Sequence, residues 1–412
     1  MSGYQVRAVR CDYRANDEEI YQSLRRATMP LHTAWAKLKQ ARRIGIKFNQ
    51  AWPPDQRVYH QGHLQQLVSE QVARATLRLL RDETNAELFC VEISVFPRAF
   101  AGDDPSPTIT LLPLLREFGV EWVNGDRPPH KVYAVPGGGQ MFRQYLLPQQ
   151  VVEADAFVSV QKLKNHAFMG ITLCLKNLFG LVPTEPYGRA RQYFHHYVRM
   201  PYMLADIGRI INPTLNILDA LVCQAGREWQ GGQARIGNAL IAGDHVIATD
   251  ACAAHLMGHD PAADWLTPPF HRDRNALLVA AEGGFGTVDL AQIDFQSEVD
   301  TPLDKFHADL IDPIERVIGW RRTTAEQALY YRDHRREFDR YTGEYILLQQ
   351  GQVRWHDRSS ELRVSRRQLA GDDPDQAMWL KYVDPDEAEG EHYEVYERVL
   401  QEVEHADLRH YR

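Results

Sequence analysis

The chain has few lysines and few cysteines. Of the 47 basic residues among its 412 residues, only 9 are lysine and the other 38 are arginine. The five cysteines never occur in a C-x-x-C spacing; they are residues 11, 90, 174, 223 and 252. Scattered cysteines argue against a disulfide framework, a zinc ribbon and an iron–sulfur cluster, and they are typical of reduced cytosolic thiols.

Long apolar segments are missing as well. No apolar run approaches the ~18–20 residues that span a bilayer. The N-terminal stretch, MSGYQVRAVRCDYRANDEE, has no apolar core of the kind found in signal peptides. We therefore expect a cytoplasmic protein with no membrane partner.

The charge distribution argues against binding to nucleic acid. The net charge is −8, and residues 291–412 carry −10, so the first 290 residues carry about +2. An acidic chain without a basic stripe is a poor ligand for a phosphate backbone. The acidic C-terminal part is either a solvated face or a surface through which an oligomer could form.

Strand and helix signals alternate along the first 290 residues. Apolar patterning predicts helices at 17–40, 61–82, 109–118, 247–257 and 274–282, and strands at 44–48, 87–95, 121–124, 155–161, 214–222 and 238–243. This alternation predicts an α/β fold, in which a mostly parallel or mixed sheet has helices on both faces.

The character changes after about residue 290. A long helix is expected at 313–340, a hairpin at 341–357, and a strand, an acidic turn and a further element at 377–400. We therefore divide the chain into an α/β domain at 1–290, with two lobes at about 1–150 and 151–290, and a C-terminal α+β region with an acidic tail at 291–412.

The strongest local signal is KLKNHAFMGITLCLKNLFGLVP at 162–183. Lys162, Lys164 and Lys176 fall within fifteen residues of a chain that otherwise uses arginine for surface charge. Lysine is a compact point charge whose pKa responds to burial, so it suits phosphate binding, carboxylate binding or proton transfer. The alternative is a set of ordinary solvated or satisfied lysines.

The neighbours of these lysines strengthen the functional interpretation. Because the sequence LKNH follows a strand, His166 is placed where side chains reach a cleft. Thr172 and Lys176 share a face on a helix, and they also share one on a strand. A histidine between lysines should have a lowered pKa and act as a neutral base near pH 7. Asn177 closes the segment, either as a ligand or as a structural cap.

These motifs resemble the domain of unknown function 362 family. The patterns KLK-x-H at 162–166 and T-x-x-x-KN-x-F-G-x-x-P at 172–183 carry the resemblance. IGIKFN, LADIGRIINP with Asp206, and LNILDALV extend it over about residues 5–290. The resemblance implies an α/β domain, often joined to four-iron clusters, for which this chain has no cysteine cluster. It also implies that Lys47 and Asn49 join the site. A weaker similarity in layout to the amino-terminal domain of lactate racemase concerns the fold alone.

Histidines and aspartates supply further candidates. His195 could be an acid/base or an anion ligand, and Asp219 could orient a lysine or histidine or cap a helix. A His/carboxylate site for iron, manganese or zinc could form from pairs of histidines and a carboxylate. Its candidate ligands are His60, His63, His195, His196, Asp206 and Asp219.

We expect an enzyme that acts on a small carboxylate- or phosphate-bearing substrate. No P-loop, dinucleotide fingerprint or nucleophile elbow occurs in the sequence. Cationic side chains would stabilise developing negative charge, and a histidine would move a proton next to a carbonyl, as in an isomerase, lyase or condensing enzyme. The catalytic candidates are Lys164, His166, Lys176, His195 and Asp219, and the substrate-binding candidates are Lys47, Asn49, Lys162, Thr172 and Asn177.

Two other functions stay open. One is a metal-dependent oxidoreductase that uses His60, His63, His196 and Asp206. The other is a non-catalytic binding or scaffold protein, which predicts that the lysine cluster is exposed, unpaired and dispensable.

Overall fold

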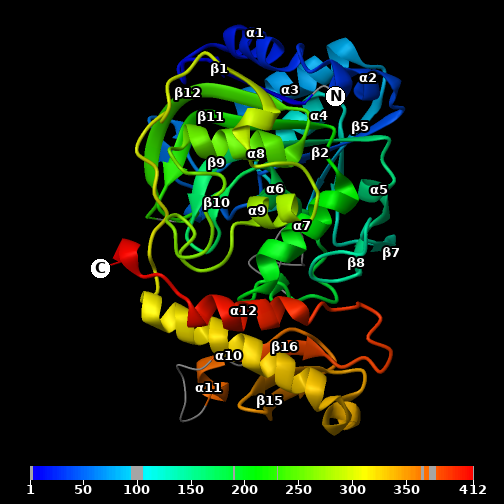
Figure 1. The fold of residues 1–412 in the computed structure, drawn as a ribbon. Coiled ribbons are helices and arrows are strands. Elements are labelled where there is room, and N and C mark those ends of the chain that lie inside the picture. The colour runs from blue at the N-terminus through cyan, green and yellow to red at the C-terminus, as the bar shows by residue number, and fades with distance from the viewer. Residues whose placement is uncertain are drawn as a thin grey trace.

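One mixed sheet organises the molecule. The computed structural model describes residues 3–93, 105–188, 191–229, 231–362, 366–370 and 377–411. Within them, nine strands form a sheet in the order β13-β1-β12-β11-β9-β2-β5-β6, with β10 paired to β9 (Figure 1). The strands are β1 Tyr4–Arg10, β2 Arg43–Phe48, β5 Glu87–Glu92, β6 Glu121–Asn124, β9 Ala156–His166, β10 Gly170–Thr172, β11 Leu215–Ala225, β12 Gln233–Gly243 and β13 Ile293–Ser297.

Most of the sheet is parallel. Strands β11, β9, β2, β5 and β6 run in one direction. Strand β12 is antiparallel to both of its neighbours, and β13 is parallel to β1. The carboxyl ends of β2, β5 and β9 therefore lie at the same edge.

Helices cover both faces. Val158 and Val160 of β9 pack into one apolar cluster with the first four helices, whereas Phe157 packs into a second cluster on the opposite face. This alternation is the two-residue period of a strand buried on both sides. One face carries α1 Asp17–Thr28, α2 His32–Gln40, α3 Glu70–Glu83 and α4 Leu112–Glu117, and the other carries α6 Cys174–Asn177, α7 Arg199–Ile211, α8 Val246–Leu256 and α9 Ala276–Glu282. The predicted α/β class is confirmed.

Two predicted helix boundaries are wrong. The expected helix at 17–40 breaks into α1 and α2 around Pro30, because a proline has no backbone N–H to continue the hydrogen-bond ladder and its ring clashes with the preceding turn. The expected helix at 61–82 begins only at Glu70, after the N-cap Ser69. The preceding residues form a short hairpin of β3 Tyr59–His60 and β4 His63–Leu64.

The C-terminal region forms a smaller layer. Its three-stranded sheet has the order β15-β14-β16, and two helices lie between it and α7 in Figure 1. Gln350 and Gly351 form the predicted hairpin turn with φ of 49° and 70°. The elements are α10 Ile314–Asp333, β14 Tyr345–Gln349, β15 Gln352–Asp357, α11 Arg366–Leu369, β16 Trp379–Tyr382 and α12 Glu394–Glu404. The main body also holds β7 His130–Ala134, β8 Gln144–Pro148 and α5 Gln149–Val152.

Strand β13, at Ile293–Ser297, is an edge strand of the large sheet, and it follows the predicted domain boundary at residue 290. The division into domains and lobes stays a prediction.

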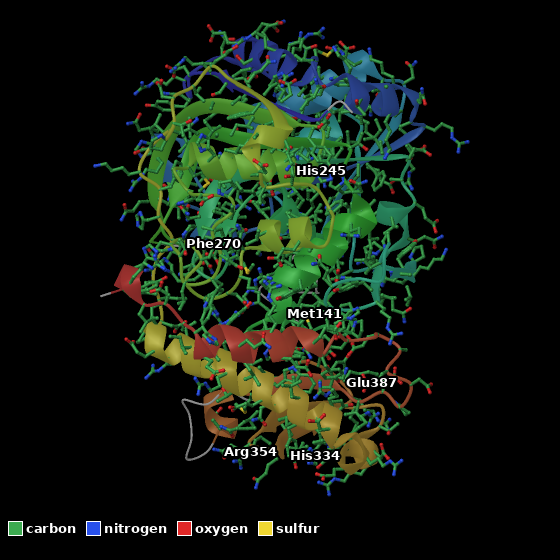
Figure 2. The ribbon with its side chains drawn as sticks, in the orientation of Figure 1. Met141, His245, Phe270, His334, Arg354 and Glu387 are labelled. Carbon is green, nitrogen blue, oxygen red and sulfur yellow. The ribbon has the colours of Figure 1, made fainter. Side chains whose placement is uncertain are left out.

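Buried charges join the C-terminal region to α7. Arg199 donates to the Glu391 carboxylate at 2.7 and 2.9 Å and to the Leu380 carbonyl at 2.6 Å. Lys381 pairs with the same carboxylate at 3.0 Å. Nearby lies Met141, which is labelled in Figure 2. Its carbonyl accepts a hydrogen bond of 2.9 Å from the His392 N–H. Because buried ions are costly unless they are fully paired, this network fixes the docking of the two parts.

A bilayer-spanning helix is not found in the described ranges, because none there is both long and apolar enough. The cytoplasmic location stays a prediction.

Two glycine-to-alanine substitutions should change stability in opposite directions. A Cβ at Gly45 in β2 would lie 2.8 Å from both Phe89 Cζ and Phe157 Cδ2. Gly45→Ala should therefore lower the free energy of unfolding by about 1–3 kcal/mol. The control is Gly319→Ala in α10, where the added Cβ meets no atom within 4 Å; it should be neutral or stabilise by up to about 1 kcal/mol. Urea unfolding measures both, and equal effects would contradict the packing of β2.

Candidate functional site

A cavity of about 340 Å³ lies at the carboxyl ends of β2, β5 and β9. Such edges are where α/β sheets usually bind ligands. Eight residues predicted from the sequence line it: Lys47, Asn49, Lys164, His166, Thr172, Lys176, Asn177 and His195. The lysine segment and the end of β2, more than a hundred residues apart in the chain, thus share one hollow.

Lys47 is fully paired inside this wall. Its ammonium donates to Glu92 Oε2 at 2.7 Å, to the Phe48 carbonyl at 2.9 Å and to Asn177 Oδ1 at 3.3 Å. Both charged side chains of this ion pair are 3% exposed. An ammonium has three N–H donors, so none is left for a substrate. Lys47 therefore lies in the cavity wall as part of an ion pair, and its role as an anion clamp stays a prediction.

Lys164 is buried but has no ion-pair partner among the described residues. Its Nζ donates to the Gln66 carbonyl at 2.6 Å and to Asn49 Oδ1 at 3.1 Å. Burial lowers the pKa of Lys164 to about 7, and Lys176 adds to this effect, whereas Glu228 opposes it. Lys164 is therefore the lysine that can exchange a proton near neutral pH.

Lys176 presents a cation to the cavity. Its Nζ lies 4.7 Å from the centre of the Phe179 ring, and within the described part of the chain it has no hydrogen bond or ion pair. Burial and the nearby Arg191 lower the pKa of Lys176 to about 8, against the opposing effect of Glu228. The short helix α6 sets its position, because Asp250 accepts hydrogen bonds from the backbone N–H groups of Cys174 and Leu175 at 2.9 and 2.7 Å.

Arg191 adds a second cation that sequence reasoning missed. It is 2% exposed, and its Nε donates to the Val182 carbonyl at 2.7 Å while Nη2 donates to the Ile93 carbonyl at 3.1 Å. Neutral carbonyls hold this side chain, and no carboxylate of the described residues pairs with it. A planar guanidinium suits two-point contact with a carboxylate or phosphate.

His166 and Glu228 form a hydrogen-bonded pair on the cavity wall. The backbone N–H groups of Phe168 and Met169 donate to His166 Nδ1 at 3.1 and 3.3 Å, so Nε2 carries the proton that faces Glu228 Oε1 at 3.0 Å. Burial lowers the pKa of His166. The pKa of Glu228 falls to about 2 despite the opposing effect of burial, because His166 and the Ala167 N–H stabilise its carboxylate. Both nitrogens of the predicted base are thus occupied, and His166 orients Glu228.

His195 is the uncommitted imidazole of the cavity. Its ring contacts Phe168 and Phe179 with centroid distances of 5.4 and 6.0 Å, and no described residue hydrogen-bonds to it. Burial lowers the pKa of His195 to about 3, with a further contribution from Lys176. The imidazole is therefore neutral in the empty cavity.

Thr172 and Asn177 have different roles. The Thr172 hydroxyl is buried without a hydrogen-bond partner among the described residues. Asn177 Nδ2 donates to the Lys47 carbonyl at 3.0 Å, to Ser159 Oγ at 3.0 Å and to the Val160 carbonyl at 3.2 Å. Asn177 therefore ties α6 to the sheet, and its amide nitrogen is not free for a substrate.

Lys162 and Asp219 lie outside the cavity lining. Lys162 Nζ is 2.8 Å from Asp219 Oδ2, and the two side chains are 1% and 0% exposed. The same carboxylate accepts from the Ser69 N–H and hydroxyl, each at 2.8 Å, at the start of α3. The predicted substrate-binding and catalytic roles are therefore corrected, because this pair anchors a helix in the core.

The predicted metal ligands do not come together. Asp206 accepts hydrogen bonds from the backbone N–H groups of residues 140–142 and from Tyr145, so its oxygens are committed to that turn. His60 and His63 pair across the β3–β4 hairpin, and the buried His196 does not line the cavity. In the ranges that the structure describes, no three His, Cys, Asp or Glu side chains group as metal ligands would.

Glu92 and Glu228 are the anionic cavity residues that the sequence prediction missed. Glu92 ends the otherwise apolar strand β5, which is a weak signal for a strand-end functional group. Glu228 and Trp229 lie in the segment CQAGREWQGG at 223–232, which carries no recognised motif. No sequence pattern pointed to Arg191 as a site residue, because arginine is common throughout this chain.

Comparison with known proteins identifies the family of the chain. A family model described as a domain of unknown function (DUF362) matches residues 45–255, and the chain belongs to this family. A curated relative, a thylakoid-associated protein of Synechocystis sp., is 31% identical over 126 residues, which cover 29% of this chain and 38% of the relative. The match therefore spans well under half of that relative. The lactate racemase apoprotein of Thermoanaerobacterium thermosaccharolyticum matches with a TM-score of 0.34 and 14% identity, over 64% of this chain and 59% of that one.

Glu228→Gln should destabilise the protein in a pH-dependent manner. The pKa of Glu228 in the folded protein, about 2, lies below its ordinary value of 4.5. Its ionised form therefore stabilises the fold above pH 4.5, and this contribution is lost as the pH falls toward 2. At pH 7 the variant should lose about 1–3 kcal/mol of unfolding free energy. Urea unfolding at several pH values measures the loss.

The matched control is Glu326→Gln, which alters an exposed glutamate of α10 and should have little effect. A difference between wild type and Glu228→Gln that stays constant between neutral pH and pH 3.5 would contradict the proposed ionisation of Glu228.

Proposed function

We propose that the protein is an enzyme that binds a small carboxylate- or phosphate-bearing molecule and moves a proton next to its carbonyl group. The observation that carries the proposal is the pair Lys176 and Arg191. Both cations line one cavity, and neither has a carboxylate partner among the described residues. Cations held away from water without a counter-ion are costly, so the site favours an anionic guest.

The rest of the cavity suits a small organic anion. Trp52, Phe179 and Trp229 provide apolar wall for a carbon skeleton. Glu92 is neutralised by Lys47, and Glu228 is hydrogen-bonded by His166. Glu228 stays ionised, but Lys176 and Arg191 outnumber it, so the net charge that faces the guest is positive. This is the arrangement that stabilises an enolate-like anion as it forms.

His195 is the group that we assign to proton transfer. Its imidazole is neutral, has no hydrogen-bond partner among the described residues and lies on the cavity wall. A bound anion would offset the effect of Lys176 and raise the pKa of His195, so the base becomes stronger when the substrate is present. The reaction class is that of an isomerase, lyase or condensing enzyme.

The scaffold hypothesis predicted exposed, unpaired and dispensable lysines. Lys162 and Lys164 are at most 5% exposed, and the half-buried Lys176 lines the cavity, which supports the enzyme proposal instead. The hypothesis of a metal-dependent oxidoreductase has no group of ligands in the described ranges to support it.

Lys176→Met should weaken binding of small anions. Loss of a hydrogen-bonding cation from the cavity should raise the Kd for pyruvate or inorganic phosphate by at least about tenfold. Fluorescence of Trp52 and Trp229, which line the cavity, measures binding. Wild-type affinity should fall as the pH rises through about 8, where Lys176 loses its proton. The control is Lys37→Met on the exposed face of α2. Equal affinities in both variants would refute the anion site.

Proton abstraction has a direct test in heavy water. The protein should catalyse exchange of the hydrogens next to the carbonyl for at least one member of a panel of small 2-oxo carboxylates in D₂O, followed by NMR. His195→Gln, which keeps a polar side chain but removes the base, should lower this exchange by about 10²-fold or more. His334→Gln, on the exposed end of α10, is the control. Exchange that survives His195→Gln unchanged would exclude His195 as the base.

A further inference from the structure

The buried lysines at this edge of the sheet differ in how many acceptors surround the nitrogen. Lys47 has three, one of them a carboxylate, and Lys162 has a carboxylate at 2.8 Å. Lys164 has two acceptors, both uncharged amide oxygens. A neutral amine has two N–H groups and one lone pair, so Asn49 and Gln66 match the neutral form and leave the lone pair unengaged.

An unpartnered hydroxyl belongs to the residue that lies opposite Lys164 in the sheet. Thr172 of β10 is directly opposite Lys164 of β9 in the antiparallel ladder, and opposite residues project on the same face of the sheet. Both residues line the cavity and both are 5% exposed. The Thr172 hydroxyl has no hydrogen-bond partner within the described ranges, although buried hydroxyls normally have one. The pair therefore presents a lone pair and a hydroxyl to the same guest.

We propose that Lys164 forms a covalent imine with the carbonyl carbon of a small 2-oxo acid or aldehyde acid. This inference rests on the proposed function, and it narrows the substrate class to carbonyl compounds that also carry a carboxylate. Lys176 and Arg191 hold the carboxylate, and Thr172 hydrogen-bonds to the carbonyl oxygen.

The covalent step needs no oxidant or reductant. The Lys164 lone pair attacks the carbonyl carbon, a C–N bond forms, and the π electrons move to oxygen, which takes up a proton relayed by the Thr172 hydroxyl. That proton comes from the attacking nitrogen, which keeps its second N–H. The carbinolamine hydroxyl then takes up a proton from solvent and leaves as water, so the product is a protonated imine. A protonated imine withdraws electrons from the adjacent carbon, so removal of a proton there by His195 becomes easier.

The pKa values of Lys164 and Lys176 restrict imine formation to a narrow pH range. Lys164 must be neutral to attack, which requires a pH near or above its pKa of about 7. Lys176 must be charged to hold the carboxylate, which requires a pH below about 8. The rate of imine formation should therefore rise through pH 7 and fall above pH 8.

Reductive trapping tests the inference on the full-length chain. The protein is incubated with glyoxylate and sodium cyanoborohydride at pH 7, and peptide mass spectrometry then measures the modification rate of each lysine. Lys164 should react at least about tenfold faster than the exposed Lys37, Lys39, Lys131 and Lys305, because an ordinary lysine is almost entirely protonated at this pH. Lys47 and Lys162 are internal controls, since they are equally buried but paired with carboxylates.

Two variants separate chemistry from folding. Lys164→Met should abolish the fast adduct, and Thr172→Val, which keeps the side-chain shape, should slow trapping while leaving the circular dichroism spectrum and the modification of exposed lysines unchanged. Wild-type trapping at Lys164 that is no faster than at exposed lysines overturns the inference, whatever the variants do.

Acetate distinguishes this failure from failure of the proposed function. Acetate should compete with glyoxylate for Lys176 and Arg191 and so suppress trapping at Lys164. If acetate binds but Lys164 does not react preferentially, the imine is wrong and the anion site stands. If acetate does not bind and Lys164 does not react, both proposals fail. Fast trapping that acetate leaves unchanged overturns the assignment to carboxylate-bearing carbonyl compounds.

Discussion

The structure depends on how the positive charges of buried ammonium groups at the carboxyl edge of a parallel sheet are neutralised. A charge taken out of water needs partners, or its pKa moves until it is neutral. Lys47 and Lys162 meet this demand with Glu92 and Asp219, and these pairs hold α6 and α3 against the strands. Lys176 has no such partner among the described residues, and Lys164 has only uncharged ones. The same edge of the sheet thus carries two kinds of lysine. Lys47 and Lys162 are paired with carboxylates, whereas Lys164 and Lys176 are not.

The C-terminal region contributes to the site without lining it. The loop that carries Arg191 and His195 leads into Arg199, which is held by Glu391 and the Leu380 carbonyl. The backbone N–H of Val198 also donates to Asp273 at 2.5 Å, and Arg321 of α10 bonds to the same aspartate. Because these contacts are buried, they restrict the loop far more than surface ion pairs would. The smaller layer therefore acts as the support of a cavity wall.

Local periodicity predicted the fold class, and the resemblance to the family implied that the end of β2 joins the lysine segment. Side chains at parallel strand ends share an edge whatever the details of packing. The pairing of each lysine was beyond reach, since Glu92, Asp219 and Glu228 are brought in by contacts between distant segments. The sequence does not distinguish Lys47 from Lys164. Their hydrogen-bond partners in the folded protein differ, and these partners leave only Lys164 without a carboxylate. The predicted metal ligands could not be tested from the sequence for the same reason. Asp206 accepts hydrogen bonds from the main chain of residues 140–142, and the spacing of residues in the sequence does not predict such contacts.

The order of the strands has a consequence for biosynthesis. Strand β2 pairs with β9, more than a hundred residues later, and the loop that bears His195 is fixed by Glu391, almost two hundred residues further on. Contacts of such long range form late, after loop closure has been overcome. A nascent polypeptide that has left the ribosome only as far as β11 already contains most of the cavity residues, yet it lacks the segment that immobilises their loop. Binding competence should therefore arise only after the segment that contains Glu391 has been synthesised and has docked on the loop.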